Sequence, residues 1–599
     1  MFKTLKELFE LLSSDQRKRF YRLQVLVVLM AFLELVGIAS IGPFMALVAD
    51  MDLIHTNAIL QQVYRFTGLD DPMDFLFFVG IGVLVMLAIA SAVSIITTWR
   101  LSMFSFSVGV QIADRLYRHY LRQNWLFHSA GSSAQLTKQI ATECQRVTQQ
   151  VINPVMQMIA RLTLTLFISG AIILYDPTVA LIGLAIFGGS YALIYRTVRR
   201  RLVRFGRQIS QTNTERFRLM NEGFGGIKDI LITGREQNFI QQFNTTGQTL
   251  ANAQGSIRAM SQIPRYFIGL LAFGALIALV LILLKIHHGA LNQVLPVLSV
   301  YALAGLKLLP ALQQIYTGIA QIKGNIASFE AIRPDLIASM SDESSQETPK
   351  QKTPTPLSGD IHLDNISFGY PGKHSVALEH ISLSIPRNTT VGIVGPSGAG
   401  KSTAIDLILG LIDPDEGSLT IGDTPVTADN KRQWQMQIGF VPQSIFLSEG
   451  SLTENIAFGL TPEQIDLDKV KRAATLAHLN ELIDSLPKGL NTHVGERGVQ
   501  LSGGQRQRVG IARALYDDAS VLVFDEATSA LDGITENAIM TAIHELTGQK
   551  TIILIAHRLK TVEQCDQIHM LDKGRVIDQG TYSELLQSNP MFRRMAEHA

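Results

Sequence analysis

The residues with the clearest chemical meaning form a glycine-rich octapeptide, Gly395-Pro-Ser-Gly-Ala-Gly-Lys-Ser402, directly after the β-branched run Thr390–Val394. The spacing G-x-x-x-x-G-K-S is that of a loop that binds phosphate groups. Glycines allow backbone N–H groups to converge on phosphate oxygens, and the N-terminus of a following helix adds partial positive charge. Lys401 would supply a cation to the β- and γ-phosphates, and Ser402 would offer its hydroxyl to Mg²⁺. The alternative is an ordinary glycine-rich turn, which the strand-then-helix context disfavours.

An acidic pair in a later segment supplies the complementary chemistry. The apolar run Val521–Phe524 ends in Asp525-Glu526. Asp525 would hold Mg²⁺, usually through water, and Glu526 lies where it could polarise an attacking water as a general base. Such a pair alone is common, but beside a phosphate loop it indicates hydrolysis of a nucleoside triphosphate. His557 follows another apolar run and could contact the γ-phosphate, although a lone histidine is more often structural.

The segment Leu501-Ser-Gly-Gly-Gln505 makes the assignment more specific. It resembles the signature sequence of ATP-binding cassette (ABC) proteins, which a generic phosphate-loop NTPase does not need. By that resemblance the nucleotide is ATP, Tyr370 stacks on its adenine, Gln443 is the Q-loop residue and His557 is the switch histidine. Two further stretches are similar to the family's D-loop and to the X-loop of its exporters: Ser529-Ala-Leu-Asp532 and Gly495-Glu-Arg-Gly498.

The resemblance assigns three sets of residues. Catalysis falls to Lys401, Glu526 and His557, and Mg²⁺ binding to Ser402, Gln443 and Asp525. Contacts to ATP come from Tyr370, Gly395, Pro396, Ser397, Gly398, Ala399, Gly400, Lys401, Ser402, Thr403, Gln443, Ser502, Gly503, Gly504 and Gln505. The signature residues would cap ATP held by the phosphate loop of another cassette. One chain carries one cassette, so the resemblance implies a homodimer with two competent sites.

The composition requires a second, less charged region. Charged residues make up 17% of the chain, against about 25% in an ordinary soluble protein. The net charge of +1 argues against a nucleic-acid partner held by bulk charge. The two cysteines, Cys144 and Cys565, are too few for a disulfide scaffold and show no metal-ligand spacing.

Long apolar runs in the first part of the chain account for the missing charge. A membrane-spanning helix needs about 20 mostly apolar residues, and buried soluble helices, the alternative, rarely run this long without a polar stripe. We therefore predict six spans, the last of them interrupted by two prolines and a lysine. The runs are Leu23–Ala49, Phe75–Thr97, Ile152–Leu174, Val179–Tyr195, Tyr266–Leu284 and Val294–Ile319.

Basic residues predict the orientation. They concentrate in residues 1–22, 98–150 and 198–260, whereas on the other side only Arg65 lies clear of a span end. By the positive-inside rule, both termini and the two long connections are cytoplasmic. We therefore predict a multi-pass protein of the cell inner membrane.

Two shorter segments predict helices at the membrane surface. Residues Phe2–Leu12 place apolar side chains at helical spacing before the first span. Residues 50–74, after that span, do the same on the outer side. Both patterns are typical of amphipathic interfacial helices, with a surface helix packed on neighbouring spans as the alternative for the second.

The chain is expected to divide at a linker. Residues 339–358 are polar and rich in Pro, Ser and Thr, and from Ile361 apolar runs of strand length alternate with helical patterns. The predicted fold is an α-helical transmembrane domain of six spans, of ABC exporter type, over residues 1–338. An α/β P-loop NTPase domain follows over residues 359–599.

The two long cytoplasmic connections are similar to the coupling helices of ABC exporters. The candidate tips are Ser132–Ile140 and Gly223–Ile230, each expected to dock beside the Gln443 loop. Closure of the cassettes would then open the spans on the outer side, which is alternating access by rigid-body motion. Six spans fused ahead of one cassette resemble exporters and not importers.

Three charged residues, Glu34, Arg161 and Lys307, fall inside predicted spans. A charge there costs roughly 2.5–3.5 kcal/mol on insertion scales, so it is a functional candidate by default. Arg161 and Lys307 could contact the phosphate of an anionic headgroup in a cavity. The alternative is a structural pair of Glu34 with Arg161 or Lys307.

Several stretches resemble the bacterial ABC flippases for lipid-linked oligosaccharides: Gly37–Pro43, Gly226–Ile230, Gly234–Glu236 and Leu306–Pro310. By this resemblance the amphiphilic cargo is a polyprenyl-pyrophosphate glycan moved from the inner to the outer leaflet. One alternative is an exporter of another lipid, a drug or a peptide. Another is an ATP-gated channel or regulatory subunit, which the intact Glu526 disfavours.

Overall fold

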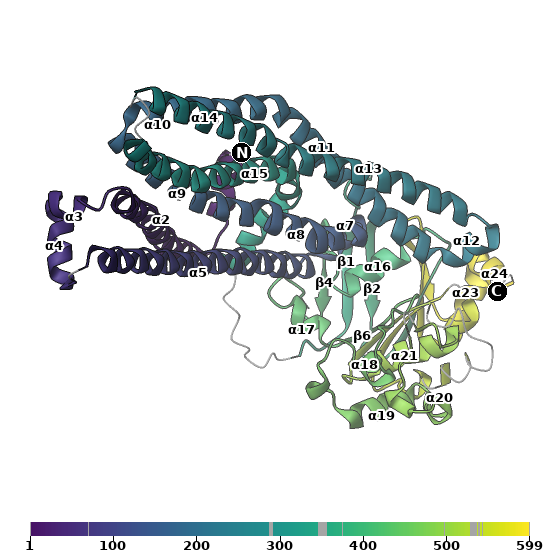
Figure 1. Cartoon of the computed structure of the whole chain (residues 1–599). Helices are drawn as coiled ribbons and strands as arrows, with labels where there is room; N and C mark the ends of the chain where they lie inside the picture. The colour runs from purple at the N-terminus through teal and green to yellow at the C-terminus, as the bar shows by residue number, and fades with distance from the viewer. Residues whose placement is uncertain are drawn as a thin grey trace. The chain divides into compact units, whose positions relative to one another are not determined.

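The computed structural model forms two compact units (Figure 1). It describes residues 2–597 except residues 70, 287–290, 345–355, 374, 496–497, 527–535, 537–539, 542 and 557. The first unit comprises Met1–Gln123 and Phe127–Glu347. The second comprises Thr348–Ala599 together with three residues from an early connection, Asn124–Leu126.

The first unit is helical throughout its described residues, as the apolar runs predict. Three of its segments are π-helical turns, η1 to η3, inserted between α-helices. Its elements are α1 (Phe2–Glu10), α2 (Ser14–Ala49), α3 (Leu53–Thr56), α4 (Ala58–Thr67), α5 (Pro72–Leu121), α6 (Trp125–Ala130), α7 (Ser133–Lys138), η1 (Gln139–Glu143), α8 (Cys144–Val147), η2 (Thr148–Ile152), α9 (Asn153–Tyr175), α10 (Pro177–Gly183), η3 (Leu184–Gly188), α11 (Gly189–Gly225), α12 (Ile227–Thr233), α13 (Glu236–Gln262), α14 (Pro264–Ile286) and α15 (Leu291–Ser344).

Five helical stretches among the described residues are long and apolar enough to cross a membrane: Ser14–Ala49, Pro72–Leu121, Ser133–Tyr175, Ala180–Gly225 and Glu236–Ile282. They overlap the first five predicted runs almost completely, since the fourth run begins one residue earlier and the fifth ends two residues later. The sixth run lies in α15, one helix of 54 residues that is not among these five. The side chains of residues 291–300, where that run begins, lie outside the described part.

The N-terminal segment differs from the single interfacial helix that its pattern predicts. The side chain of Ser13 accepts a hydrogen bond from the Gln16 backbone N–H (3.2 Å), and the Gln16 side chain accepts one from the Ser13 N–H (2.8 Å). This capping box begins α2 at Ser14 and separates it from α1. Leu8 and Leu12 are buried in one cluster with Leu116 of α5, so the segment packs on the bundle.

The segment after the first span folds as two short helices, α3 and α4, in place of the one predicted. Ile54 is buried in a cluster with Leu47 and Phe75. Phe66, near the end of α4, is 92% exposed. The segment therefore packs on its neighbours on one side and presents apolar surface on the other, so each of the two alternatives describes part of it.

The boundaries of the predicted tips and linker also differ. The short separate helix of the first connection is α6 (Trp125–Ala130), ahead of the predicted Ser132–Ile140, which instead falls in α7 and η1. In the second connection the separate helix is α12, ended by Gly234 in the left-handed region at φ 62°. Residues 339–344 belong to α15, so the predicted linker begins after Ser344.

The second unit contains two sheets, as expected for an α/β domain. One is antiparallel, in the order β2-β1-β4-β5, and the other has the order β10-β9-β3-β8-β7-β6. In the six-stranded sheet β9, β3, β8, β7 and β6 are parallel, and β10 pairs with β9 antiparallel. The strands are β1 (Ile361–Phe368), β2 (Leu378–Ile385), β3 (Thr390–Val394), β4 (Glu416–Ile421), β5 (Thr424–Pro425), β6 (Ile438–Val441), β7 (Val521–Asp525), β8 (Thr551–Ile555), β9 (Gln567–Asp572) and β10 (Arg575–Gly580).

The parallel arrangement explains why the site residues follow strands. The carboxyl ends of parallel strands lie at one edge of a sheet, where ligands bind in such folds. The strands β3 and β7 both pair with β8, so the phosphate loop and the acidic pair leave the sheet at this edge. The described helices are α16 (Lys401–Ile408), α17 (Lys431–Gln435), α18 (Leu452–Ile456), η4 (Pro462–Gln464), α19 (Leu467–Leu476), α20 (Asn480–Ser485), η5 (Gly489–Asn491), α21 (Gly503–Leu515), η7 (Leu559–Val562), α23 (Tyr582–Ser588) and α24 (Pro590–Glu597).

Candidate nucleotide and membrane sites

The phosphate loop has the backbone that its glycines predict. All five residues of β3 are buried, and the loop leads from this strand into α16. Gly395 has φ 154°, and a Cβ there would lie 2.2 Å from the Leu571 carbonyl oxygen. Gly400 has φ 102°, and its Cβ would lie 2.7 Å from Leu378 Cδ2. Both positions therefore require glycine for the backbone conformation and for the close approach of neighbouring strands.

Lys401 is buried inside this loop, with 6% of its surface exposed. Its ammonium donates hydrogen bonds to the carbonyl oxygens of Gly395 (2.7 Å) and Pro396 (3.1 Å). Burial lowers the pKa of Lys401, and the nearby carboxylates of Glu526 and Asp525 oppose that shift. A cation in a low-dielectric loop attracts a phosphate more strongly than one in water, so the site suits an anionic ligand.

Tyr370, the residue expected to stack on adenine, contacts the start of α16. The hydroxyl of Tyr370 lies 3.3 Å from Thr403 Oγ1. The Tyr370 ring packs edge-on against Phe368, with the ring centroids 5.1 Å apart. The ammonium of Lys373 lies 5.3 Å from the centroid of the Tyr370 ring. Tyr370 is thus held beside the phosphate loop, with its ring available for stacking contacts.

The acidic pair lies at the end of β7, close to Lys401. Gln443 Nε2 donates a hydrogen bond of 2.6 Å to Glu526 Oε2. The backbone of Glu526 is in the left-handed region at φ 50°, and its N–H donates to the Ile555 carbonyl oxygen (3.2 Å). A non-glycine residue in that region carries strain, which is concentrated at functional sites. The structure therefore brings together the predicted Lys401, Gln443 and Glu526.

The predicted metal ligands have the right chemistry for Mg²⁺. Ser402 offers a hydroxyl, Asp525 a carboxylate and Gln443 an amide oxygen, and Mg²⁺ prefers oxygen ligands shared with nucleotide phosphates. The Gln443 amide donates to Glu526 through its nitrogen, so its oxygen is the atom that would face a metal. The donor set fits the ion.

The signature segment begins a helix. Ser502 caps the N-terminus of α21, and its hydroxyl accepts a hydrogen bond from the Gln505 backbone N–H (3.2 Å). The Gln505 side chain accepts one from the Ser502 N–H (2.8 Å). Ser502 is exposed, and Gly503 and Gly504 form the first turn. Their N–H groups lie at the positive end of the helix dipole, so this exposed helix N-terminus suits the binding of a phosphate group.

Some predicted positions lie outside the described residues. These are His557, the D-loop stretch 529–532 and the central two residues of the X-loop, Glu496 and Arg497. Their assigned roles stay predictions.

Sequence reasoning missed Asp406, which lies one helical turn after Ser402 on α16. Its pKa is raised to about 6 chiefly because burial disfavours the carboxylate, and the nearby Asp525 raises it further. A hydrogen bond from the side chain of Trp125, one of the three early residues in this unit, acts in the opposite direction. The i, i+4 spacing from Ser402 was the available signal, because it puts a carboxyl group on the side of α16 that carries the predicted metal ligand.

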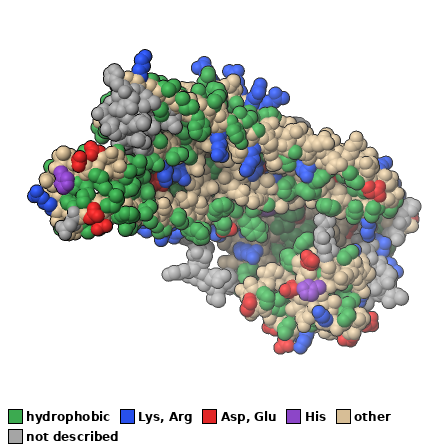
Figure 2. Space-filling model, in the orientation of Figure 1, with side chains coloured by type: hydrophobic (Ala, Val, Ile, Leu, Met, Phe, Trp, Pro, Cys, Tyr) green, Lys and Arg blue, Asp and Glu red, His purple; other side chains and the backbone are tan. Residues whose placement is uncertain are grey.

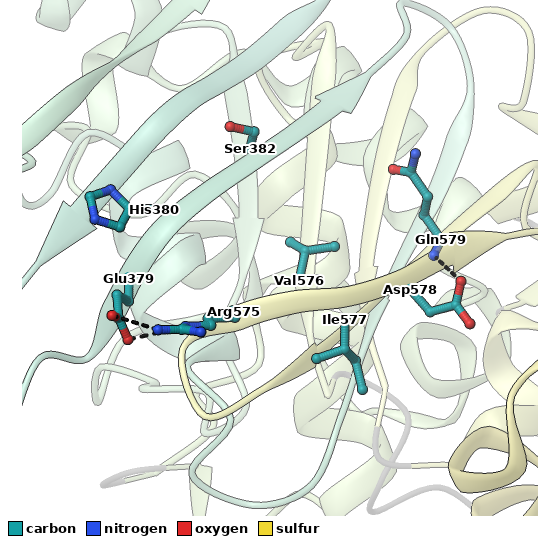
Figure 3. Close-up of a pocket in the computed structure, with 8 residues that line it drawn as sticks. All are labelled: Glu379, His380, Ser382, Arg575, Val576, Ile577, Asp578 and Gln579. Atoms are coloured by element: carbon teal, nitrogen blue, oxygen red, sulfur yellow. Dashed lines mark hydrogen bonds and ion pairs between the residues drawn. The ribbon is translucent and has the colours of Figure 1, made fainter.

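A second hollow lies away from these residues. It has a volume of about 640 Å³ and is lined by Glu379, His380, Ser382, Arg575, Val576, Ile577, Asp578 and Gln579 (Figure 3). The side chain of Arg575 donates to both carboxylate oxygens of Glu379, at 3.1 and 2.6 Å (Figure 3). None of the predicted nucleotide contacts lines this hollow, so it is separate from the phosphate loop.

Two of the charges in the predicted spans form a pair. Lys307 Nζ lies 3.4 Å from Glu34 Oε2, and Ser94 donates a hydrogen bond of 2.6 Å to Glu34 Oε1. The Glu34 side chain is 7% exposed, whereas that of Lys307 is 50% exposed. This is one of the pairings that the structural alternative predicts, and it leaves half of the lysine surface open.

Arg161 is the third charge, and its partner is an amide. Its Nε donates to Gln314 Oε1 of α15. One buried apolar cluster joins α2, α9 and α15 through Ala31, Leu164 and Ala304. Gln314 lies seven residues after Lys307 on α15, so Arg161 contacts this helix about 10 Å along its axis from the Glu34–Lys307 pair.

Two family models match the chain. The model described as "ABC transporter transmembrane region" matches residues 39–303, and the model described as "ABC transporter" matches residues 378–529. The second match covers the phosphate loop, the signature segment and the acidic pair.

The chain is similar to proteins called "ATP-dependent lipid A-core flippase". It is 30% identical to that of Cupriavidus metallidurans over 500 residues, 82% of each chain. It is 28% identical to that of Photobacterium profundum over 533 residues, 88% of this chain and 89% of the relative. In fold it is similar to a solved bacterial Atm1-family ABC exporter with ATP bound, with a TM-score of 0.76 at 22% identity over 96% of this chain and 99% of the other.

Proposed function

Because the chain belongs to the ABC transporter family and is a multi-pass exporter that couples ATP hydrolysis to transport, we propose that it is a lipid flippase. Its proposed cargo is a lipid-linked oligosaccharide, moved from the inner to the outer leaflet of the cell inner membrane. The observation that carries this proposal is the half-open Lys307 on α15, the same helix that supplies Gln314 to Arg161.

The chemistry of these two cations favours a phosphorylated lipid. Arg161 and Lys307 can both donate hydrogen bonds to phosphate oxygens, and such charge-assisted bonds are stronger in a poorly hydrated site. Glu34 fixes the position of Lys307 and neutralises part of its charge. An amphiphile would leave its acyl or prenyl tail in the bilayer while its phosphate is held between these helices. A polyprenyl-pyrophosphate glycan meets this description.

The energy source is ATP bound between two cassettes of a homodimer. In this proposal Lys401 and the loop N–H groups hold the phosphates, and Glu526 accepts the proton of the attacking water. Ser502 and its helix N-terminus contact the nucleotide held by the partner subunit. When Mg²⁺ is bound, Ser402, Gln443 and Asp525 would hold it, and the ion would neutralise charge on the phosphates.

Closure of the cassettes changes which side of the membrane the cargo site faces. We place both termini and the two long connections in the cytoplasm, in keeping with their basic residues. Binding of two ATP molecules would hold the cassettes together, and loss of the bridging γ-phosphate with repulsion between products would release them. The short helices α6 and α12 are the segments proposed to transmit this motion to the spans.

A second cargo is favoured by the relatives. They are called lipid A-core flippases, and they match this chain over most of its length. Lipid A-core is also a phosphorylated glycolipid, so Arg161 and Lys307 would serve it by the same chemistry. The two cargoes differ in the lipid, which is polyprenyl in one case and multiply acylated in the other.

Reconstitution into liposomes tests the proposal. We expect ATP hydrolysis to rise with polyprenyl-pyrophosphate glycan, and we expect the labelled glycan to become accessible on the opposite face of the bilayer. Stimulation by lipid A-core alone would move the assignment to the second cargo, and stimulation only by drugs or peptides would overturn both lipid assignments. Glu526→Gln serves as the control, because it removes the base but keeps an amide oxygen that can accept the Gln443 hydrogen bond. Unchanged hydrolysis in Glu526→Gln would favour an ATP-gated channel or regulatory subunit.

A further inference from the structure

A row of exposed arginines runs along α11 just beyond its apolar part. Within twelve residues the helix carries six arginines, all of them exposed, and we call this set the arginine stripe. Its members are Arg196, Arg199, Arg200, Arg201, Arg204 and Arg207. Figure 2 shows Lys and Arg side chains gathered on the face of the first unit where α11 lies in Figure 1.

The stripe faces away from the bundle. At 100° per residue, Arg196, Arg200, Arg204 and Arg207 fall within an arc of about 80°. On the same helical wheel Leu202 and Ile209, which are 0% and 3% exposed, lie on the opposite side. The apolar face of α11 therefore packs on its own unit, and the arginines point outward from it.

The stripe begins where exposed apolar residues end. Leu184 and Leu193, just ahead of it, are 67% and 70% exposed, and Leu193 lies on the same side of the helix as Arg196. The helix α14 shows the reverse order along the chain, because exposed Arg265 is followed by Leu270 at 70% exposure. An outward surface that changes from apolar to cationic along a spanning helix lies at the level of the lipid headgroups.

The stripe arginines have no partner within the part of the chain that the structure describes: none of them forms an ion pair there. Farther along the same helix, Arg218 is paired with Glu215 and Glu222 at 2.5 and 2.7 Å. The helix thus supplies carboxylates to Arg218, whereas Arg216 donates to the Phe243 carbonyl oxygen and the arginines beside the apolar part have no carboxylate among the described residues.

We infer that the arginine stripe binds the phosphate groups of anionic diacyl phospholipids in the leaflet that it borders. The planar guanidinium matches a phosphate with two parallel hydrogen bonds, and clusters of four to eight basic residues beside a span are typical of sites for anionic lipids. These lipids surround the protein and are not the transported cargo. The inference rests on the membrane placement of α11 and goes beyond the proposed function.

Spin-labelled lipids measure this binding in reconstituted membranes of phosphatidylcholine. The readout is the association constant of spin-labelled phosphatidylglycerol relative to that of spin-labelled phosphatidylcholine. We expect wild-type protein to prefer phosphatidylglycerol by about twofold or more, and we expect about 1 M salt to abolish the preference. No ATP or cargo is present, so the result is independent of the proposed transport activity.

The decisive variant replaces Arg196, Arg200, Arg204 and Arg207 by Gln and should bring the relative constant close to one. The same four positions changed to Lys should keep most of the preference, because the charge is retained. A matched control removes four exposed cations from the second unit by changing Arg387, Lys471, Arg472 and Lys488 to Gln, and should leave the preference unchanged.

Two results would overturn the inference. One is an unchanged preference for phosphatidylglycerol in the four-Gln variant, and the other is the absence of any preference in wild-type protein. The second result is also expected if another copy of the chain covers the stripe, and crosslinking of an Arg200→Cys variant would then report that contact.

Discussion

Two buried glutamates in the helical unit, Glu34 and Glu143, are held in different ways. The side chain of Glu143 is fully buried and lies 3.0 Å from both Lys138 Nζ and Arg146 Nη1, whose side chains are 7% and 13% exposed. Among the described residues, Glu34 pairs with one cation, Lys307, whose side chain is 50% exposed. The first carboxylate is enclosed by its partners, whereas the partner of the second still faces outward.

The surroundings extend this contrast. Ser210 donates to Glu143, Lys138 donates to Thr214, and Arg146 donates to Asn325. These bonds join the segment α7–α8 to α11 and α15 with nearly every polar group engaged. The comparison teaches that a buried charge indicates a ligand site only when its partner retains open surface. We therefore regard the Glu143 cluster as structural and propose that Lys307, the partner of Glu34, is available to cargo.

The largest expected effect comes from breaking the enclosed cluster. Glu143→Ala leaves Lys138 and Arg146 buried without a counterion, which should cost about 3–5 kcal/mol of stability. The measurement is the thermal midpoint of the detergent-purified protein. The control is Glu222→Ala, which removes an exposed partner of Arg218 and should change the midpoint little. Equal midpoints for the two variants would show that burial does not separate the two kinds of ion pair.

Removing Lys307 from its pair with Glu34 should affect transport more than folding. Lys307→Ala removes a donor to phosphate and should lower the rate of flipping by about tenfold or more, because a charge-assisted hydrogen bond contributes about 1.5–3 kcal/mol. Basal ATP hydrolysis should be retained. The double variant Lys307→Ala/Glu34→Gln avoids an unpaired buried carboxylate, so it should fold normally and still fail to flip. Normal flipping by the double variant would place the cargo elsewhere.

Arg161→Ala tests the second cation that is proposed to contact the cargo phosphate. Its partner Gln314 is neutral, so the substitution leaves no charge behind. We expect a loss of flipping similar to that of Lys307→Ala, with an unchanged thermal midpoint. A lower midpoint together with unaltered flipping would mean that Arg161 is structural.

Asp406 extends the comparison to a carboxyl group whose hydrogen-bond partner is neutral, the indole of Trp125. Its folded-state pKa of about 6 lies above the ordinary value of 3.8. The stabilisation from this group is therefore full below about pH 4 and is lost as the pH rises through 6. Asp406→Asn keeps an acceptor for Trp125 and should make the second unit about 1–2 kcal/mol more stable than wild type at pH 7.5. The difference should disappear near pH 4.

Asp466 provides a control of opposite sign. It caps α19, and the backbone N–H of Lys469 lowers its pKa. Its stabilisation is present above its ordinary pKa and is lost as the pH falls, so Asp466→Asn should destabilise the unit at pH 7.5. Unfolding in denaturant at both pH values measures the two variants together. Shifts of the same sign would contradict the assignment for Asp406.

Much of the nucleotide site could be predicted because its chemistry is local in sequence. Gly395, Gly400 and Lys401 lie within one loop directly after a strand, so the sequence motif alone predicts the conformation of that loop. The apolar runs likewise predict long helices, because length and composition alone decide whether a helix suits a bilayer. The hydrogen bond from Gln443 to Glu526 joins distant segments, and here the family resemblance provided the expectation.

The Glu143 cluster could not be predicted in this way. Lys138 and Arg146 counted only as basic residues of a connection, and Lys138 lies five residues before Glu143, a spacing that does not share a face of an α-helix. The π-helical turn η1 changes that spacing, since its i to i+5 hydrogen bonds bring such residues to one side. The position of α6 could not be predicted either, because the sequence gives no strong signal for the end of α5.

The left-handed backbone of Glu526 has a consequence for variants that arise naturally. Glycine adopts φ 50° without the strain of about 1 kcal/mol that a side chain brings there. A change from glutamate to glycine would therefore remove the proposed base and relieve the backbone at the same time. Cellular proteases and chaperones respond to unfolding and not to lost turnover. Such a protein would therefore accumulate without being removed.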